Sequence, residues 1–267
     1  MRKPPPLKND CFALPQGANW TPVDEALGYL KLASKCLVGT EKLSAVSAAG
    51  RVLAEKVHAL YSSPPHKNSA VDGYALNSKD LKESDLISLT ILPGIAAAGH
   101  PYYGEVMLGE ALPIYTGAKM PAGTDTVILQ EDTVSENNKL TFYGPLKSGA
   151  NTRDLGEDVE KNSSILLKGR RITAGDIALM ASTGVSSITV YSKLKVGIFS
   201  TGDEIVSSGS EFAIGQVFDA NRPLLNALLD IWGFDVIDLG ILRDDRKHIE
   251  TTLEKASTEV DLSLIHI

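Results

Sequence analysis

The chain has 267 residues, of which 43% are hydrophobic and 22% charged, and its formal net charge is −7. This length fits one large domain or two to three small ones, and the acidic balance argues against a nucleic-acid binder that works by neutralising phosphates. The chain has only two cysteines, so we expect no disulfide framework. It has no secretory signal and no apolar run near the ~20 residues that span a bilayer. We therefore expect a soluble, cytoplasmic protein.

Residues 1–20 are proline-rich and are expected to form an extended arm. Thr21 is predicted to cap a helix with Pro22 at its first position, and apolar residues at helical spacing extend this helix to about Lys35. The stretch 62–76, SSPPHKNSAVDGYAL, has the composition of a loop.

Residues 85–145 are predicted to be rich in β-structure. Short runs of branched, aromatic and threonine residues alternate there with Gly, Pro or Asn clusters, which is typical of a small barrel or sandwich. The runs are ISLTILP, GEVML, ALPIYT, TDTVILQED and KLTFYG.

The following segment is mixed. ILLKG and residues 187–191 are predicted strands, and residues 174–182 (AGDIALMAS) are a predicted helix with Gly184 at its end.

From Lys195 onward, strands alternate with helices. KVGIFS, DVIDLGIL and EVDLSLIHI are predicted strands, and residues 221–231 and 245–255 are the predicted helices between them. This alternation indicates an open parallel sheet, and ligands of such sheets bind at the carboxyl ends of the strands.

Two acidic loops leave the sheet in that direction: Thr201-Gly202-Asp203-Glu204 and Arg243-Asp244-Asp245. Converging carboxylates suit Mg²⁺, and a Ser-Thr-Gly turn offers hydroxyl and N–H groups to an anion. The alternative is structural, because Asp is common in turns and Asp244 precedes a helix that needs a cap. Asp72 in DGY and Thr116 in YTG are, by themselves, ordinary turn residues.

Six segments in order resemble the molybdopterin molybdenumtransferase family, which includes bacterial MoeA and the gephyrin E domain. They are NSAVDGYAL (68–76), IYTGAKMPAGTDTVILQED (114–132), NTRDLGEDV (151–159), VGIFSTGDEIV (196–206), GQVFDANRPLL (215–225) and LGILRDDR (239–246). Together they cover about residues 10 to 261.

The resemblance implies a multi-domain α+β and α/β fold. After the arm, it predicts an elongated, dimer-forming domain (21–84 plus 146–193), a β-rich insert (85–145) and a partial α/β domain of the molybdopterin-binding type (194–267). In this family the last predicted strand leads into a Ser-Gly-Gly loop and further domains, so we expect a C-terminally truncated chain with impaired activity.

The implied reaction inserts molybdate into adenylated molybdopterin with Mg²⁺ and releases AMP. The resemblance implies a homodimer, and a molybdopterin adenylyltransferase as the upstream partner. It implies catalytic roles for Asp72, Thr116, Glu204 and Asp244, substrate binding by Ser200, Thr201, Gly202, Asp203 and Asn221, and a metal site at Asp244 and Asp245.

Two other functions are compatible with parts of the sequence. One is a non-catalytic dimeric scaffold of the same fold. The other is a competence-damage-type nucleotide hydrolase, which shares the α/β module but begins with it, whereas here almost 190 residues of matching sequence precede the module.

Overall fold

A computed structural model describes residues 21–81 and 86–266, so the predicted N-terminal arm lies outside the described residues. The chain divides into two compact units, Met1–Val38 and Gly39–Ile267. The first contains α1 (Val23–Ala33), whose N-cap is Pro22 rather than the predicted Thr21. No residue of α1 is buried, and Tyr29 donates a hydrogen bond to Glu25 across one helical turn. Among the described residues, no helix is both long and apolar enough to cross a membrane.

Three short antiparallel strand pairs and one helix form the first part of the second unit. The pairs are β1 (Thr40–Ser44) with β12 (Ser187–Tyr191), β2 (Val57–His58) with β11 (Ser164–Leu166), and β3 (Asn68–Ser69) with β10 (Thr152–Arg153). The helix α2 (Ala174–Ser182) has the predicted bounds. It begins with a capping box between Thr173 and Asp176, and Arg170 pairs with the buried Asp176 carboxylate.

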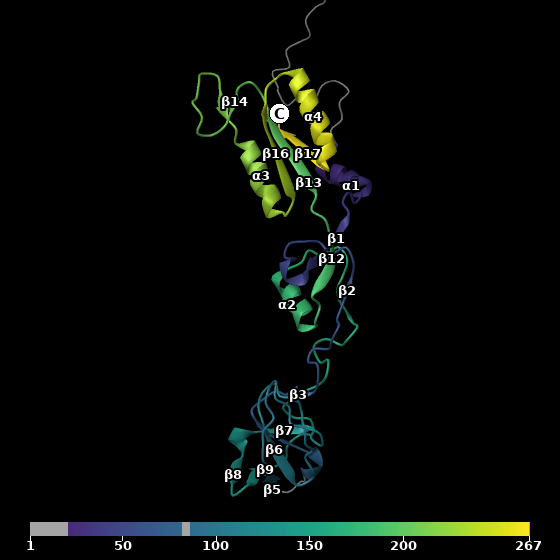
Figure 1. Ribbon diagram of the computed structural model, residues 1–267, viewed down its shortest axis with the longest axis vertical. Coiled ribbons are helices and arrows are strands. Elements are labelled where there is room, and N and C mark those ends of the chain that lie inside the picture. The colour runs from purple at the N-terminus through teal and green to yellow at the C-terminus, as the bar shows by residue number, and fades with distance from the viewer. Residues whose placement is uncertain (1–20, 82–85, 267) are drawn as a thin grey trace, which may run out of the picture. The chain divides into compact units, whose positions relative to one another are not determined.

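A six-stranded sheet forms the β-rich part, as Figure 1 shows. Its order is β7 (Thr126–Leu129), β4 (Gly73–Leu76), β6 (Glu110–Ile114), β5 (Leu86–Ile91), β9 (Lys139–Tyr143) and β8 (Val134–Glu136). Two clusters of buried apolar side chains pack on it, with Leu112, Ile114, Val127 and Leu140 fully buried. Short 3₁₀ turns at Ala45–Ser47, Ser78–Asp80 and Gln130–Asp132 complete this region and the preceding one.

The predicted loop at 62–76 is wrong for its last four residues. Gly73–Leu76 form β4, which pairs with both β6 and β7, so the sheet includes residues before position 85. Gly73 is required by this pairing, because a Cβ atom there would overlap the carbonyl oxygen of Ile128. The predicted strand GEVML is also wrong, since only an isolated bridge joins Glu105 to Ala122.

The predicted parallel sheet is confirmed. Three strands lie in the order β16 (Asp235–Leu242), β13 (Lys195–Thr201) and β17 (Leu262–His266), and both pairings are parallel. The central strand β13 is buried over five consecutive residues, which is the pattern of a strand covered on both faces.

The helices α3 (Asn221–Ile231) and α4 (Arg246–Glu259) connect these strands. The crossover from β13 to β16 and the crossover from β16 to β17 run in opposite directions across the sheet. Because such crossovers are right-handed, the two helices cover opposite faces, as Figure 1 shows. Val196, Ile198 and Leu229 form the buried core between sheet and helix.

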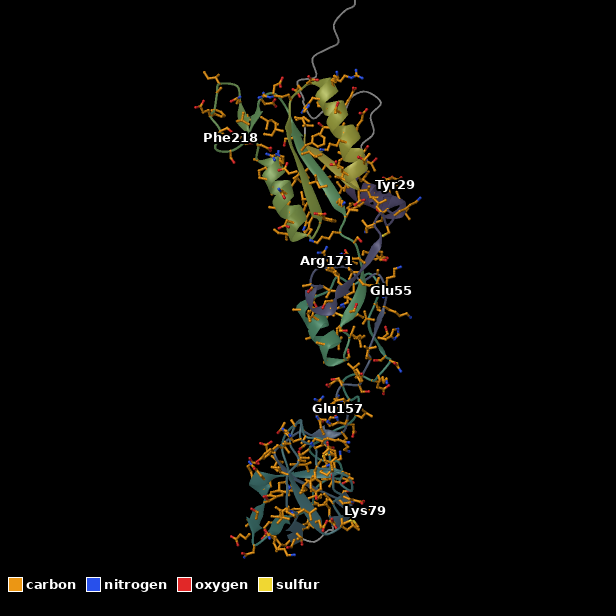
Figure 2. The ribbon with its side chains drawn as sticks, in the orientation of Figure 1. Tyr29, Glu55, Lys79, Glu157, Arg171 and Phe218 are labelled. Atoms are coloured by element: carbon orange, nitrogen blue, oxygen red, sulfur yellow. The ribbon has the colours of Figure 1, made fainter. Side chains whose placement is uncertain are left out.

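A long connection between β13 and α3 contains the short parallel pair β14 (Ile205–Val206) and β15 (Val217–Phe218). Phe218, at the outer side of this connection in Figure 2, has its ring centroid 5.0 Å from that of Phe212. The connection is tied to the first acidic loop, since Val217 N–H donates to the carbonyl of Glu204.

Candidate functional site

The carboxyl ends of β13 and β16 lie side by side and carry the two acidic loops. The loop after β13 leads to α3 on one face of the sheet, and the loop after β16 leads to α4 on the other. Because β13 and β16 are parallel neighbours, both loops leave the sheet at its carboxyl edge, where open α/β sheets bind ligands. The predicted convergence of the two loops is therefore confirmed.

Hydrogen bonds join the two loops directly. The Gly202 N–H donates to the carbonyl of Leu242 at 3.1 Å, and the Asp244 N–H donates to Asp203 Oδ1 at 3.3 Å. Arg243 Nη1 donates to the Asp203 carbonyl at 3.2 Å. Asp203 therefore receives two contacts from the loop of the neighbouring strand.

Four carboxylates of these loops are exposed: Asp203, Glu204, Asp244 and Asp245. Asp245 caps a helix, and the other three, Asp203, Glu204 and Asp244, are hereafter the exposed acids. Their charges are poorly balanced, because the one cation within ion-pair range among the described residues is Arg243, 4.0 Å from Asp203 Oδ1. Glu204 folds over Gly202, so that its Oε2 would lie 2.5 Å from a Cβ at that position. The backbone φ of Gly202 is +146°, which also disfavours a side chain.

Asp245 has a structural role that the sequence assigned to its neighbour. Its Oδ1 accepts hydrogen bonds from the Lys247 and His248 N–H groups at 2.8 and 3.1 Å, so Asp245, not Asp244, is the N-cap of α4. The predicted cap at Asp244 is therefore wrong, and the Asp244 carboxylate does not cap the helix.

No group of three or more Cys, His, Asp or Glu side chains suited to a metal occurs within the part of the chain that the structure describes. Mg²⁺ does not require one, since it is commonly held by one or two carboxylates, water and substrate phosphates. Asp203 and Asp244, brought together by the loop contacts, are a donor set of that kind.

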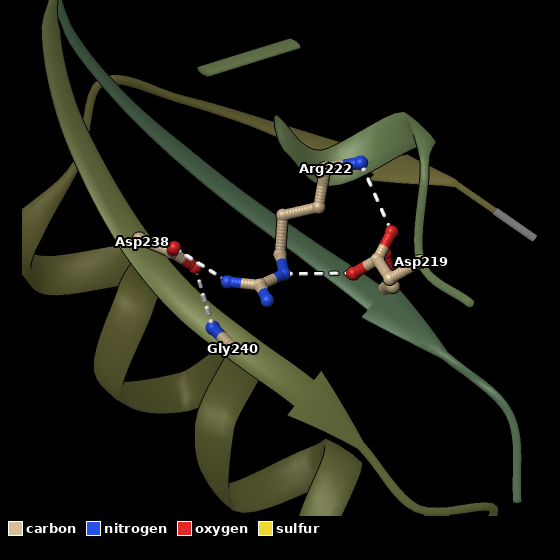
Figure 3. Close-up of polar contacts among 5 residues, drawn as sticks. Asp219, Arg222, Asp238 and Gly240 are labelled. Atoms are coloured by element: carbon tan, nitrogen blue, oxygen red, sulfur yellow. Dashed lines mark hydrogen bonds and ion pairs between the residues drawn. The ribbon is translucent and has the colours of Figure 1, made fainter. Parts of the chain in front are cut away.

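A second set of polar side chains joins β13, the start of α3 and β16: Ser200, Asp219, Arg222 and Asp238. It is hereafter the buried network, after its buried members Ser200 and Asp219; Arg222 is half-buried and Asp238 is exposed. The sequence interpretation selected Ser200 and missed the other three. Arg222 Nε donates to Asp219 Oδ2 at 2.9 Å, and Arg222 Nη1 lies 2.5 Å from Asp238 Oδ2 (Figure 3). The Ser200 hydroxyl donates to Asp219 at 3.1 Å. The Asp219 side chain is only 3% exposed, yet its charge is matched.

The pKa values of this network follow from its contacts. Burial acts to raise the pKa of Asp219, but hydrogen bonds from the Arg222 side chain and backbone and from Ser200 outweigh it, so the pKa is lowered. The hydrogen bond to Asp238, followed by that to Asp219, raises the pKa of Arg222. Asp219 and Arg222 are therefore both ionised at neutral pH.

The motif FDANRP contains two members of this network, Asp219 and Arg222, but the sequence analysis selected only Asn221 from it. Asn221 is the first residue of α3 and half-buried, between the two network residues Asp219 and Arg222. Thr201 is likewise half-buried, at the end of β13. An acid just before a helix and a basic residue three positions later is a recognisable i, i+3 pair.

Asp72 and Thr116 come together in the β-rich part. Asp72 Oδ1 accepts hydrogen bonds from the Thr116 N–H and hydroxyl, both at 2.7 Å. These bonds, the backbone one first, lower the pKa of Asp72, although both residues are exposed. The Asp72 carbonyl accepts from Gln130 N–H at 3.2 Å, so β4 and β7 fix the backbone on which the carboxylate stands.

Comparison with known families gives two matches along the chain. The family model described as "MoeA N-terminal region (domain I and II)" matches residues 21–184, and that described as "Probable molybdopterin binding domain" matches residues 197–265.

Characterised relatives and solved structures agree with these matches. The chain is 39% identical over 224 residues to a molybdopterin molybdenumtransferase of Haemophilus influenzae, covering 84% of this chain and 55% of that protein. It is 34% identical to the protein of that name from Nostoc, covering 84% of this chain and 52% of that one. The chain thus spans about half the length of these relatives.

A crystal structure of a molybdopterin biosynthesis MoeA protein from Pyrococcus horikoshii superposes with a TM-score of 0.86 at 35% identity, over 92% of this chain and 66% of that one. A second MoeA structure from Pyrococcus gives a TM-score of 0.80 at 31% identity, over 92% of this chain and 63% of that one.

Proposed function

The chain belongs to the MoeA family, and from this premise we propose that it takes part in molybdenum cofactor biosynthesis by inserting molybdate into adenylated molybdopterin with release of AMP. The observation that supports this most strongly is the contact between the two acidic loops at the carboxyl edge of the parallel sheet. That position suits a phosphorylated nucleotide-like substrate.

Asp244 and Asp203 would hold Mg²⁺ together with phosphate oxygens of the substrate. When bound, Mg²⁺ would neutralise negative charge on the pyrophosphate of the substrate, one phosphate of which leaves as part of AMP. In this proposal Asp245 does not bind the metal. As the N-cap of α4, it keeps the backbone of the Asp244 loop in place.

Two of the donors predicted in the turn at the end of β13 are already used, because the Ser200 hydroxyl donates to Asp219 and the Gly202 N–H donates to Leu242. Thr201 is proposed as the contact of this turn to the rest of the pyrophosphate. Thr201 and the backbone of Gly202 lie beside Glu204, and the absence of a Cβ at Gly202 allows the Glu204 carboxylate to approach the backbone closely. We assign Glu204 to the reacting end of the substrate. Ser200 is engaged with Asp219, so its role in substrate binding is indirect, and Asn221 is proposed as a contact from the start of α3.

Asp72 and Thr116 are proposed as the second half of the site. A carboxylate whose pKa is lowered by two hydrogen bonds remains ionised and fixed in direction, which suits a group that orients a substrate. The proposal includes a homodimer in which this pair faces the acidic loops of the partner subunit. It also includes a cytoplasmic setting and supply of the substrate by a molybdopterin adenylyltransferase.

A second candidate function is a non-catalytic dimeric scaffold. The observation that favours it is α1, on which Val23, Leu30 and Leu32 are 74%, 62% and 87% exposed. A helix without a buried residue gains its stability from a partner. This candidate predicts self-association without AMP release.

The test is AMP release by the purified chain supplied with adenylated molybdopterin, molybdate and Mg²⁺. We expect release to be lost in Asp244→Ala and retained in the control Glu250→Ala, which removes an exposed acid of α4 that pairs with Arg246. Self-association would support the scaffold if neither this chain nor a version extended to the length of the relatives releases AMP. Equal release from wild type and Asp244→Ala would refute the metal role of Asp244.

A further inference from the structure

The buried network coincides with an irregularity in the sheet. Ile198 of β13 pairs with Asp238 of β16, but Ser200 pairs with Ile241, so two steps on β13 correspond to three on β16. The extra residue makes a β-bulge, and Gly240 within it has a φ of +81°. Bulges redirect the end of a strand and are common beside active sites.

Asp238 holds this bulge in two ways. Its Oδ1 accepts a hydrogen bond from the Gly240 N–H at 2.9 Å, and its Oδ2 receives Arg222 (Figure 3). Arg222 in turn is anchored at the start of α3 by Asp219, through both its side chain and its backbone N–H. One guanidinium therefore joins the end of the connection that follows β13 to the bulge of β16.

The contact at the bulge affects Asp244, which lies four residues beyond Gly240. β16 ends at Leu242, whose carbonyl accepts from Gly202, and the chain then reaches Asp244, whose N–H donates to Asp203. The direction in which β16 leaves the bulge thus sets whether these two inter-loop hydrogen bonds form.

We propose that Arg222, acting through Asp238 and the Gly240 bulge, is a positioning residue that sets the spacing of the two acidic loops. Arg222 does not contact the exposed acids itself. Lysine cannot replace it, because a single ammonium group cannot make the two-sided contact of a planar guanidinium. The effect on the loops is a property of the fold, and its catalytic consequence rests on the proposed function.

Hydrogen exchange of the 267-residue chain tests the positioning role without any substrate. In Arg222→Lys we expect the amides of Gly202 and Asp244 to exchange at least about tenfold faster, while the β13 amides of 196–199 keep their protection. The matched control is Arg246→Lys, which alters an exposed pair with Glu250 on α4. It should leave all of these amides unchanged.

A second pair of variants separates the bulge from the charge. Asp238→Asn keeps an oxygen that can accept from Gly240 N–H and should retain part of the protection, whereas Asp238→Ala should behave like Arg222→Lys. Uniformly faster exchange throughout β13 would show that Arg222 only stabilises the fold. Unchanged exchange at Gly202 and Asp244 in both Arg222→Lys and Asp238→Ala would also overturn the proposal.

The catalytic consequence is read in the AMP-release assay. Arg222→Lys should raise the Mg²⁺ concentration for half-maximal release about 10–100-fold, a range typical of residues that orient metal ligands, with a smaller change in the rate at saturating Mg²⁺. If neither the wild-type chain nor a version extended to the length of the relatives releases AMP, the proposed function fails, while the exchange result still decides the positioning role.

Discussion

The exposed acids and the buried network occupy the same end of the parallel sheet but balance their charges differently. In the buried network, Asp219 and Asp238 share the Arg222 guanidinium, and the buried Asp219 carboxylate accepts hydrogen bonds from three donors. The exposed acids have one cation, Arg243, at the limit of ion-pair distance. Carboxylates that are paired within the protein stabilise the fold, whereas carboxylates without a close cation remain available to bind a ligand. Four predictions test this division.

The largest effect is expected from Arg222→Met. It leaves Asp219 buried without its cation, and the free energy of unfolding of the α/β part should fall by about 3–5 kcal/mol. Urea unfolding followed by the fluorescence of Trp232, at the end of α3, measures the loss. Arg246→Met, which removes an exposed pair, should cost no more than about 1 kcal/mol. Similar losses in both variants would remove the basis for the comparison.

Gly202→Ala should have the next largest effect. The new Cβ meets the Glu204 carboxylate at a φ of +146°, and a strained residue of this kind costs about 1–3 kcal/mol. AMP release should fall because Glu204 is displaced. Gly209→Ala is the control, since its φ is +84° but no heavy atom lies within 4 Å of the new Cβ. Both variants should lose stability, and full AMP release by Gly202→Ala would contradict the role given to Glu204.

Asp245→Ala and Asp244→Ala should differ although the residues are adjacent. Asp245→Ala removes the N-cap of α4 and should lower the free energy of unfolding by about 1 kcal/mol. Asp244→Ala removes an exposed carboxylate and should change it by less than about 0.5 kcal/mol. Thermal melts of the two variants decide, and the reverse order would show that the cap has been assigned to the wrong residue.

The smallest expected effect is the loss of stability when the Asp219 carboxylate is protonated, which occurs only in acid. Because its pKa is lowered in the folded state, it contributes stability above its unfolded pKa of about 3.9, and that stability is lost as the pH falls through the folded value. Urea midpoints between pH 6 and pH 2 should therefore fall more steeply for wild type than for D219N. Parallel curves would show that the ionised form of Asp219 is not favoured by folding.

The sequence predicted the parallel sheet well because its signal is local. Strand and helix alternate from Lys195 onward, and α2 and α3 have the predicted bounds because apolar spacing defines both and a capping box begins α2. The strand Gly73–Leu76 was missed because its four residues follow a stretch of serine, proline and small polar residues, SSPPHKNSAVD. Its identity depends on Ile128 of a strand more than fifty positions away.

The candidate site was predicted in part. The motifs identified the exposed acids, and strand order brings their loops together as expected. The Arg222–Asp238 pair was not predictable, because it joins residues sixteen positions apart across a sheet whose register changes at a bulge. The cap of α4 was misplaced by one residue, which is the precision that composition allows at a helix boundary.

The central claim is that the exposed acids, and not the capping or buried ones, bind the divalent cation of the substrate. Binding of Mn²⁺, as a spectroscopic substitute for Mg²⁺, to the chain with adenylated molybdopterin can be followed by electron paramagnetic resonance. We predict that Asp244→Ala loses cation binding at an unchanged melting temperature, whereas Asp245→Ala melts earlier but still binds. Wild-type affinity in Asp244→Ala would contradict the account.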